Sequence, residues 1–455
     1  MTSPRRIFGC LAVAALVVSA GLADARPIAA STSAPVSVSA PRATVHFLER
    51  ITFTGDATLT TDVRRVEIVI DVEGSTRSFV ADVPTTVRSG AAKLTYELSS
   101  PGGAILPNTS LEARFRIVLT DGTLIPGPPS TVHYDDTRYT WQSVSGEFVT
   151  VHWTEGGAAF GRRARRIADD AIREVGALLG VEEKDPIDFF IYADRTAFYD
   201  ILGPGSRENV GGEAHTDIRT LFANIGPTLI DDPWVGVVVP HELTHLVFDT
   251  AVRNPYHFPP TWLNEGLAVY LSEGYGTSDR GAVAGAVSDG TLMPLLGLDG
   301  AFPTAADRFY LAYSESVSAV SFLVDTYGRD AMVTLVRSYA AGVSDDEAFT
   351  AALGTDVTGF EAAWLESIGA VPPKPFGPVD APAGPVPSGW GGAAPTPGAV
   401  STPGPTPVAS AEAVNGGPGS GEGSSVSPFV AIASVLAVLM ATRWARRQGR
   451  PLPPR

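Results

Sequence analysis

The sequence predicts a multi-domain protein: an N-terminal all-β sandwich, an α+β domain with a helical C-terminal part, a disordered stalk and one transmembrane helix. Three features predict it: short strands separated by Pro and Gly, then apolar positions at helical spacing, then a long uncharged apolar run near the C-terminus. With 455 residues, of which 44% are hydrophobic and 18% charged, the chain is long enough for two or more cores.

Residues 1–25 have the three parts of an export signal peptide. A charged start at Arg5 and Arg6 precedes an apolar segment, and Ala23 and Ala25, with one residue between them, form a small-x-small cleavage site. The alternative is an uncleaved anchor helix. The single cysteine, Cys10, lies within the apolar segment, so the processed chain can form no disulfide and no cysteine-based site.

Residues 26–140 predict an immunoglobulin-like sandwich, because about seven short strands alternate with Pro- and Gly-rich turns. The predicted strands are residues 44–48, 51–53, 66–71, 78–83, 93–98, 111–119 and 131–134. Nothing here has the spacing of a catalytic site, and His46 and His133 are expected to be ordinary strand residues.

Residues 141–370 predict the α+β domain. Strands are expected at 148–153, 187–192 and 221–225, and an apolar stripe over 160–179 predicts a helix that ends at Gly180. The remaining predicted elements are all helices, over residues 233–250, 260–273, 309–327, 330–340, 345–353 and 358–368.

The C-terminal region predicts a membrane anchor. Residues 371–427 contain 25 Pro or Gly among 57, a composition typical of a disordered linker. The uncharged run 426–442 then indicates a transmembrane helix over residues 428–444, and residues 445–455 form a basic cytoplasmic tail. A buried globular helix is the alternative, but the flanking sequence offers nothing to bury it. We expect a single-pass protein of the cell membrane whose folded domains are extracytoplasmic.

The charge excludes one class of partner. Without the signal peptide and the residues after 442, 26 basic and 48 acidic residues remain, a net charge of −22. Such a surface repels nucleic acid, so we expect no nucleic-acid partner.

The run His-Glu-Leu-Thr-His from His241 to His245 is the most informative motif. On a helix, positions i and i+4 lie on one side, so both imidazoles can bind one metal ion. Glu242 lies beside them, where it can take a proton from a metal-bound water. An Asp-Asp-Pro sequence ending at Pro233 favours a helix start, and Pro240 either kinks this helix or lies in its first turn.

A catalytic zinc ion needs a third protein ligand. Met-turn zincins are excluded, because Phe248 and Ala251 stand where that class has Gly and His. Asp249 continues the helical face and is expected to support a ligand or to be structural. Glu265, twenty positions after His245 in the first turn of the next predicted helix, fits best.

Together these motifs resemble the gluzincin zinc metallopeptidases, over about residues 145–370. The first motif looks like thermolysin, whereas the Trp-Leu-Asn-Glu-Gly-Leu-Ala run at 262–268 is closer to aminopeptidase N and peptidase-MA-like proteins. The resemblance implies one Zn²⁺ per chain, a general base and three zinc ligands. The implied base is Glu242, and the implied ligands are His241, His245 and Glu265.

The resemblance also implies a tyrosine that donates a hydrogen bond to the oxyanion. Tyr313 is the better match and Tyr310, one turn earlier, is the alternative; either could be a packing aromatic. Because no histidine follows His257, the downstream histidine of thermolysin-type enzymes has no counterpart.

The sequence departs from these families in two places. The Gly-x-Met-Glu-Asn strand of aminopeptidases is reduced to residues 211–214, which lack the Met and Asn, so exopeptidase action is not implied. Val269 replaces a carboxylate that thermolysin-like enzymes place four residues after the third ligand.

Residues 220–225 are expected to be the edge strand that pairs with an extended peptide. His215 and His257 are expected to be surface or packing residues.

We therefore expect a membrane-anchored, extracytoplasmic zinc metallopeptidase that acts on a peptide or protein. The alternative is a surface binding or adhesion protein with an inactive protease-like domain, and a third possibility is hydrolysis of a non-peptide bond. The sequence leaves the substrate, the cleavage position and the oligomeric state open.

Overall fold

The computed structural model describes residues 36–59, 62–204 and 211–373. The predicted signal peptide, almost all of the predicted linker, the transmembrane helix and the basic tail lie outside the described residues. Among the helices of the described part, none combines the length and the apolar character needed to cross a bilayer.

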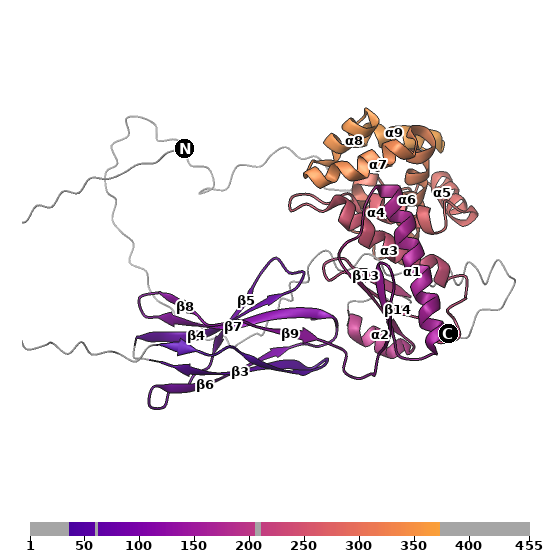
Figure 1. Ribbon diagram of the computed structural model, residues 1–455. Coiled ribbons are helices and arrows are strands. Elements are labelled where there is room, and N and C mark those ends of the chain that lie inside the picture. Colours follow the sequence, from indigo (N-terminus) through magenta and orange to yellow (C-terminus); the bar gives the residue numbers. More distant parts are fainter. Residues whose placement is uncertain (1–35, 60–61, 205–210, 374–455) are drawn as a thin grey trace, which may run out of the picture.

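The N-terminal region is a sandwich of two antiparallel sheets, drawn in indigo and purple in Figure 1. In the first sheet the central strand pairs with the other three; its strands are β1 (Ser37–Val38), β2 (Arg42–His46), β3 (Arg50–Thr58) and β6 (Ala91–Ser99). The second sheet contains β5 (Phe79–Val83), β4 (Val63–Val72), β7 (Thr109–Leu119), β8 (Leu124–Pro126) and β9 (Ser130–Tyr134).

Alternating burial builds the core of the sandwich. Along β3 and β7 every second side chain is buried, as expected for strands with one face on the core. Phe53, Ile68 and Phe115 are fully buried there. All seven predicted strands are present, and the two-residue β1 and three-residue β8 are the additions. The immunoglobulin-like assignment stays a prediction.

The second domain begins with a mixed five-stranded sheet. Its order is β10-β11-β12-β14-β13, and its strands are β10 (Gln142–Ser145), β11 (Val149–Trp153), β12 (Ile187–Tyr192), β13 (Gly212–His215) and β14 (Thr220–Asn224). The three inner strands are parallel, and both outer strands are antiparallel to their neighbours.

One prediction about this sheet is wrong. Residues 220–225 were expected at the edge, but β14 lies between β12 and β13, and β13 is the outer strand. The four residues Gly-Glu-Ala-His of β13 are too short and too polar to give a strand signal, because their partner strand supplies most of the order.

Helices cover both faces of the sheet. On one face α1 (Ala158–Leu179) and α3 (Val235–Val252) pack against each other and on the strands. On the other face α2 (Arg195–Leu202) packs on aromatic strand residues. The period-2 alternation of β12 makes this possible, since Phe189 and Ile191 face α1 and α3 while Phe190 and Tyr192 face α2.

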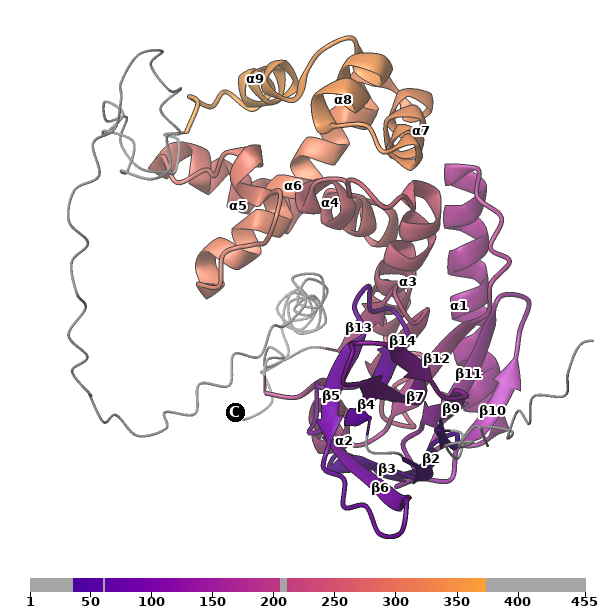
Figure 2. The same cartoon turned by 90° about the vertical axis from the view of Figure 1, so that its left-hand side faces the viewer.

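The rest of the domain is helical and lies beyond α3, as Figure 2 shows. It consists of α4 (Thr261–Ser272), α5 (Thr277–Asp289), α6 (Ala306–Tyr327), α7 (Arg329–Ser338), α8 (Asp345–Leu353), α9 (Val357–Ser367) and two short 3₁₀ helices, η1 (Leu295–Leu298) and η2 (Tyr339–Ala341). Trp262 of α4 stacks on Phe360 of α9 with ring centroids 5.8 Å apart, so the last helix is anchored on the helix next to α3.

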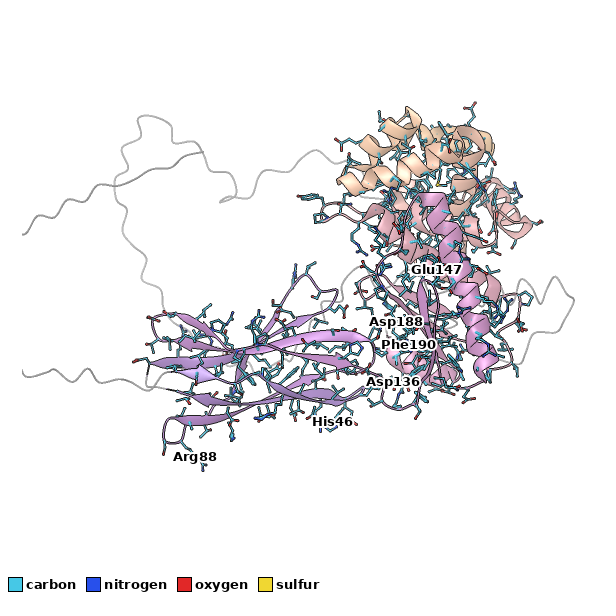
Figure 3. The ribbon with its side chains drawn as sticks, viewed as in Figure 1. His46, Arg88, Asp136, Glu147, Asp188 and Phe190 are labelled. Atoms are coloured by element: carbon cyan, nitrogen blue, oxygen red, sulfur yellow. The ribbon has the colours of Figure 1, made fainter. Side chains whose placement is uncertain are left out.

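The sandwich and the second domain share a polar and aromatic interface. In Figure 3, Asp136, Asp188 and Phe190 all lie where the two domains meet, and Arg88 marks the opposite end of the sandwich. Asp136, which follows β9, accepts hydrogen bonds from Arg138 (2.8 Å) and from the Tyr192 hydroxyl of β12 (3.0 Å). The sheet of the second domain is therefore braced by the sandwich.

Candidate metal centre

Helix α3 presents the two histidines of the central motif. It runs through Pro240, which has no N–H to donate to the Gly236 carbonyl. The helix therefore begins well before Pro240, and the Thr244 hydroxyl donates to the Pro240 carbonyl at 2.8 Å. Most of α3 is buried on all sides, so the imidazoles of His241 and His245 are held inside the protein.

Glu265 of α4 completes a compact triangle with these histidines. The two Nε2 atoms are 3.2 Å apart, and Glu265 Oε2 lies 3.5 Å from His241 Nε2 and 3.6 Å from His245 Nε2. Within the described residues this is the one group of three His, Cys, Asp or Glu side chains that could hold a metal ion.

The size of the triangle fits a tetrahedral ion. Two ligand atoms at about 2.05 Å from a tetrahedral zinc ion lie about 3.3 Å apart. The three measured separations, 3.2, 3.5 and 3.6 Å, cluster around that value. Two imidazole nitrogens and one carboxylate oxygen also form a donor set that zinc prefers in catalytic sites.

The three side chains of the triangle are buried away from water, and this shifts their pKa values. Both oxygens of Glu265 are buried and have no hydrogen bond of normal geometry among the described residues. Loss of solvent raises the pKa of Glu265 well above its usual value and lowers the pKa of His245 to about 4. The pKa of His241 is lowered by burial and by the neighbouring His245. Neutral imidazoles with free lone pairs and an unsatisfied carboxyl group are what a cation needs.

Asn264 orients one of the imidazoles. Its side-chain oxygen lies 3.0 Å from His245 Nδ1. With the proton on Nδ1, the imidazole donates to Asn264 and keeps the Nε2 lone pair toward the triangle. The sequence contained a signal for this contact, since Asn264 directly precedes Glu265, but the resemblance alone did not indicate its role.

Glu242 lies beside the triangle under the outer strand β13. It is almost fully buried, and the backbone N–H of Ala214 donates to its Oε2 at 3.1 Å. Burial raises the pKa of Glu242 well above its usual value, and the charges of Glu265 and Glu213 add to the rise. A Cβ on Gly212 would lie 3.3 Å from Glu242 Cγ, so glycine lets β13 pass close over this carboxyl group.

Tyr313 of α6 reaches the same centre. Its ring packs edge-on against Phe302 at 5.0 Å, and its hydroxyl is close enough to Glu265 to oppose the rise in pKa of that carboxyl group. Tyr310, the alternative, is only partly buried and packs against Phe309 at 5.8 Å.

Three other predicted side chains contact different groups. Asp249 was expected to support a ligand or to be structural; it forms an ion pair with Arg253 at 2.9 Å one helical turn further along α3. His257 lies 3.0 Å from Asp345, and His215 packs edge-on against Phe222.

The comparison with protein families decides the assignment. Residues 167–370 match the family model of the Peptidase MA superfamily. This part of the chain is a Peptidase MA superfamily domain. The matched range runs from α1 to just beyond α9 and includes His241, Glu242, His245, Glu265 and Tyr313. The resemblance to peptidase-MA-like proteins is thereby confirmed for the peptidase MA domain.

Solved structures show weaker likenesses. An aminopeptidase N family protein from Idiomarina loihiensis has 10% identity and a TM-score of 0.40, over 72% of this chain and 75% of its own. An M1 zinc metallopeptidase from Deinococcus radiodurans has 12% identity and a TM-score of 0.34, over 76% of this chain and 97% of its own.

A purple acid phosphatase from seeds of yellow lupin (Lupinus luteus) has 12% identity and a TM-score of 0.20. The match covers 34% of this chain and only 29% of the phosphatase chain. No curated protein matches the sequence. Because all these TM-scores lie below 0.5, the family assignment depends on the sequence match of residues 167–370.

Proposed function

We propose that the peptidase MA domain is a zinc-dependent hydrolase of peptide bonds. The triangle of His241, His245 and Glu265 carries this proposal, because its three separations fit a tetrahedral zinc ion and its two imidazole nitrogens and one carboxylate oxygen are donors that zinc prefers. The stoichiometry expected from one triangle is one zinc ion per chain.

A zinc ion bound there would lower the pKa of a water molecule and polarise a carbonyl group. Glu242 is the group that we assign as general base. Its carboxyl group lies beside the triangle, where it can take a proton from water and return it to the leaving amine. Its bond to Ala214 fixes the carboxyl group for both transfers.

Tyr313 is the proposed donor to the oxyanion. It is buried beside Glu265, and its hydroxyl can donate a hydrogen bond as negative charge develops on the substrate oxygen. One donor of this kind contributes about 10²–10³-fold to kcat.

The outer strand β13 suggests how a peptide is held. Among the described residues β13 pairs only with β14, so its other side can add an extended peptide as a further strand. Because Ala214 of β13 bonds to Glu242, a peptide paired there lies next to the proposed base.

The proposed location rests on the sequence. The export signal expected at residues 1–25, the membrane helix expected at 428–444 and the basic residues after it favour a peptidase MA domain that lies outside the cytoplasm and is tethered to the cell membrane. Protease treatment of intact cells tests this location, since an added protease degrades the domain only if the domain is exposed outside the membrane.

The variant Glu242→Gln tests the function. Peptide hydrolysis by residues 26–370 should fall about 10²–10⁴-fold, because the general base is lost, while zinc content stays unchanged. Asp249→Asn makes the same chemical change on the same helix away from the triangle and should keep activity within about twofold. A peptide library read by mass spectrometry, with and without chelator, gives activity and cleavage position. A purified wild-type protein with no stoichiometric zinc would instead favour a binding or adhesion protein.

A further inference from the structure

Tyr313 belongs to a run of ten consecutive buried residues on α6, from Ala312 to Ser321, and the two residues after Tyr313 make polar contacts with other segments. The hydroxyl of its neighbour Ser314 donates to Asp279 Oδ1 of α5 at 2.8 Å, and both of these side chains are buried. The backbone N–H of Met293 donates to both carboxylate oxygens of Glu315, each at 3.2 Å. Successive residues on a helix point about 100° apart, so these contacts hold one turn of α6 from different directions.

A third contact fixes the distance between α6 and the helix that carries Glu265. A Cβ on Gly266 would lie 2.5 Å from the carbonyl oxygen of Ser316, so α4 and α6 meet there with backbone almost against backbone. Glu265 is one residue from this point and Tyr313 is three residues from it. This close approach of the two helices therefore lies within one turn of both functional side chains.

The position of the Tyr313 hydroxyl is sensitive to the rotation of α6. Side chains end about 5 Å or more from the helix axis, so a rotation of about 10° moves a side-chain tip by about 1 Å. A displacement of that size at a reacting group can cost up to about 10²-fold in rate. The α4–α6 contact limits translation, and the side-chain contacts of Ser314 and Glu315 limit rotation.

We propose that Ser314 and Asp279 are positioning residues, which hold α6 in the rotation that aims the Tyr313 hydroxyl at the oxyanion. This inference rests on the proposed function, because it takes Tyr313 as the catalytic donor. A merely structural hydrogen bond would change stability without changing the chemical step.

The variant Ser314→Ala, with Ser318→Ala as its control, tests the proposal. Ser318 is buried one turn further along α6 and accepts a hydrogen bond from Trp364 Nε1 at 3.2 Å, so both variants lose one buried side-chain contact of the same helix. Both should lower Tm by similar amounts. Only Ser314→Ala should lower kcat, by roughly tenfold or more, with KM and zinc content unchanged. Equal kcat values for the two variants would overturn the proposal.

A double-mutant cycle separates positioning from a general loss of structure. Tyr313→Phe removes the proposed donor and should lower kcat about 10²–10³-fold. If Ser314 acts through the Tyr313 hydroxyl, Ser314→Ala has no further effect on kcat in the Tyr313→Phe background. An equal additional loss in both backgrounds contradicts the inference.

A structural measurement distinguishes this inference from the proposed function. In crystals of the metal-free protein, Ser314→Ala should displace the Tyr313 hydroxyl from Glu265 by about 1 Å relative to wild type, whereas Ser318→Ala leaves it in place. An unmoved hydroxyl refutes the positioning role even if the wild-type enzyme is active. A wild-type protein without chelator-sensitive hydrolysis refutes the proposed function, and the displacement still shows whether Ser314 positions the tyrosine.

Discussion

Two buried carboxyl groups lie within one small volume at the centre of the peptidase MA domain. Glu242 and Glu265 are almost fully buried, and the charge of Glu265 helps to raise the pKa of Glu242. Without a cation, ionisation of both carboxyl groups is unfavourable, since no positive charge lies in the triangle to compensate them. The arrangement is therefore one that a divalent cation stabilises.

Substitution of Asn264 tests whether its side chain orients the His245 imidazole for zinc binding. Asn264→Ala removes the oxygen next to His245 Nδ1, so the imidazole loses the group that orients it. We expect zinc affinity to fall about 10–100-fold in competition with a chromophoric chelator. Asn264→Asp keeps an acceptor oxygen and should bind zinc at least as tightly as wild type. Unchanged affinity in Asn264→Ala would show that packing alone orients His245.

At the scale of elements, the contact between α4 and α6 gives a second test. Gly266→Ala places a methyl group against the Ser316 carbonyl, so the helices must separate. Urea denaturation should show a loss of about 1–3 kcal/mol in unfolding free energy, and zinc affinity should fall with it. Gly281→Ala on α5 is the control, because its Cβ meets nothing within 4 Å, and it should stabilise the protein by about 0.5–1 kcal/mol. Equal effects of the two variants would contradict the close approach.

Elements with strong local signals were predictable, and elements that depend on neighbours were not. The apolar run of β12 and the helically spaced apolar stripe of α1 are local sequence patterns, so their predicted bounds agree closely with the structure. In contrast α5, with the sequence Thr-Ser-Asp-Arg-Gly-Ala-Val-Ala-Gly-Ala-Val-Ser-Asp, has small residues and no apolar stripe. The strand β13 has four residues and takes its order from β14.

The same distinction applies to the site. The triangle was predictable because i, i+4 spacing on a helix fixes how two histidines meet, and because Glu265 falls in the first turn of the next predicted helix. The bond between Asp279 and Ser314 joins residues 35 apart in the chain, through the packing of α5 on α6. No local pattern encodes that contact, so the sequence could not indicate it.

At the scale of the whole molecule, the sandwich covers an aromatic face of the peptidase MA domain. Phe190 and Phe222 of the sheet form a cluster with α2, and Phe47 of the sandwich packs against that cluster. Asn108 adds polar contacts, because its side-chain nitrogen donates to Asp188 at 3.1 Å and to Thr220 at 2.9 Å. Because this face is buried, we expect the sandwich to be part of the fold rather than a separately displayed module.

Arg138 is the residue by which this coupling can be tested. It binds the buried Asp136 of its own segment and reaches Asp200 of α2 at 3.0 Å. Arg138→Ala leaves Asp136 without its counter-charge, so we expect a loss of about 2–3 kcal/mol in unfolding free energy, less than for a fully buried pair. Arg114→Ala, which removes exposed ion pairs of the sandwich alone, should cost under about 1 kcal/mol.

Calorimetry of residues 36–373 then shows whether the two domains unfold together. If the shared face couples them, wild type gives one transition whose calorimetric and van't Hoff enthalpies agree, because exposing the aromatic cluster destabilises both domains at once. Arg138→Ala weakens the bridge and should separate the transitions, while Arg114→Ala keeps them merged. Residues 141–373 alone expose Phe190 and Phe222 and should melt lower and bind a hydrophobic dye. Two transitions in wild type, or a stable isolated domain, would mean that the sandwich is an independent module.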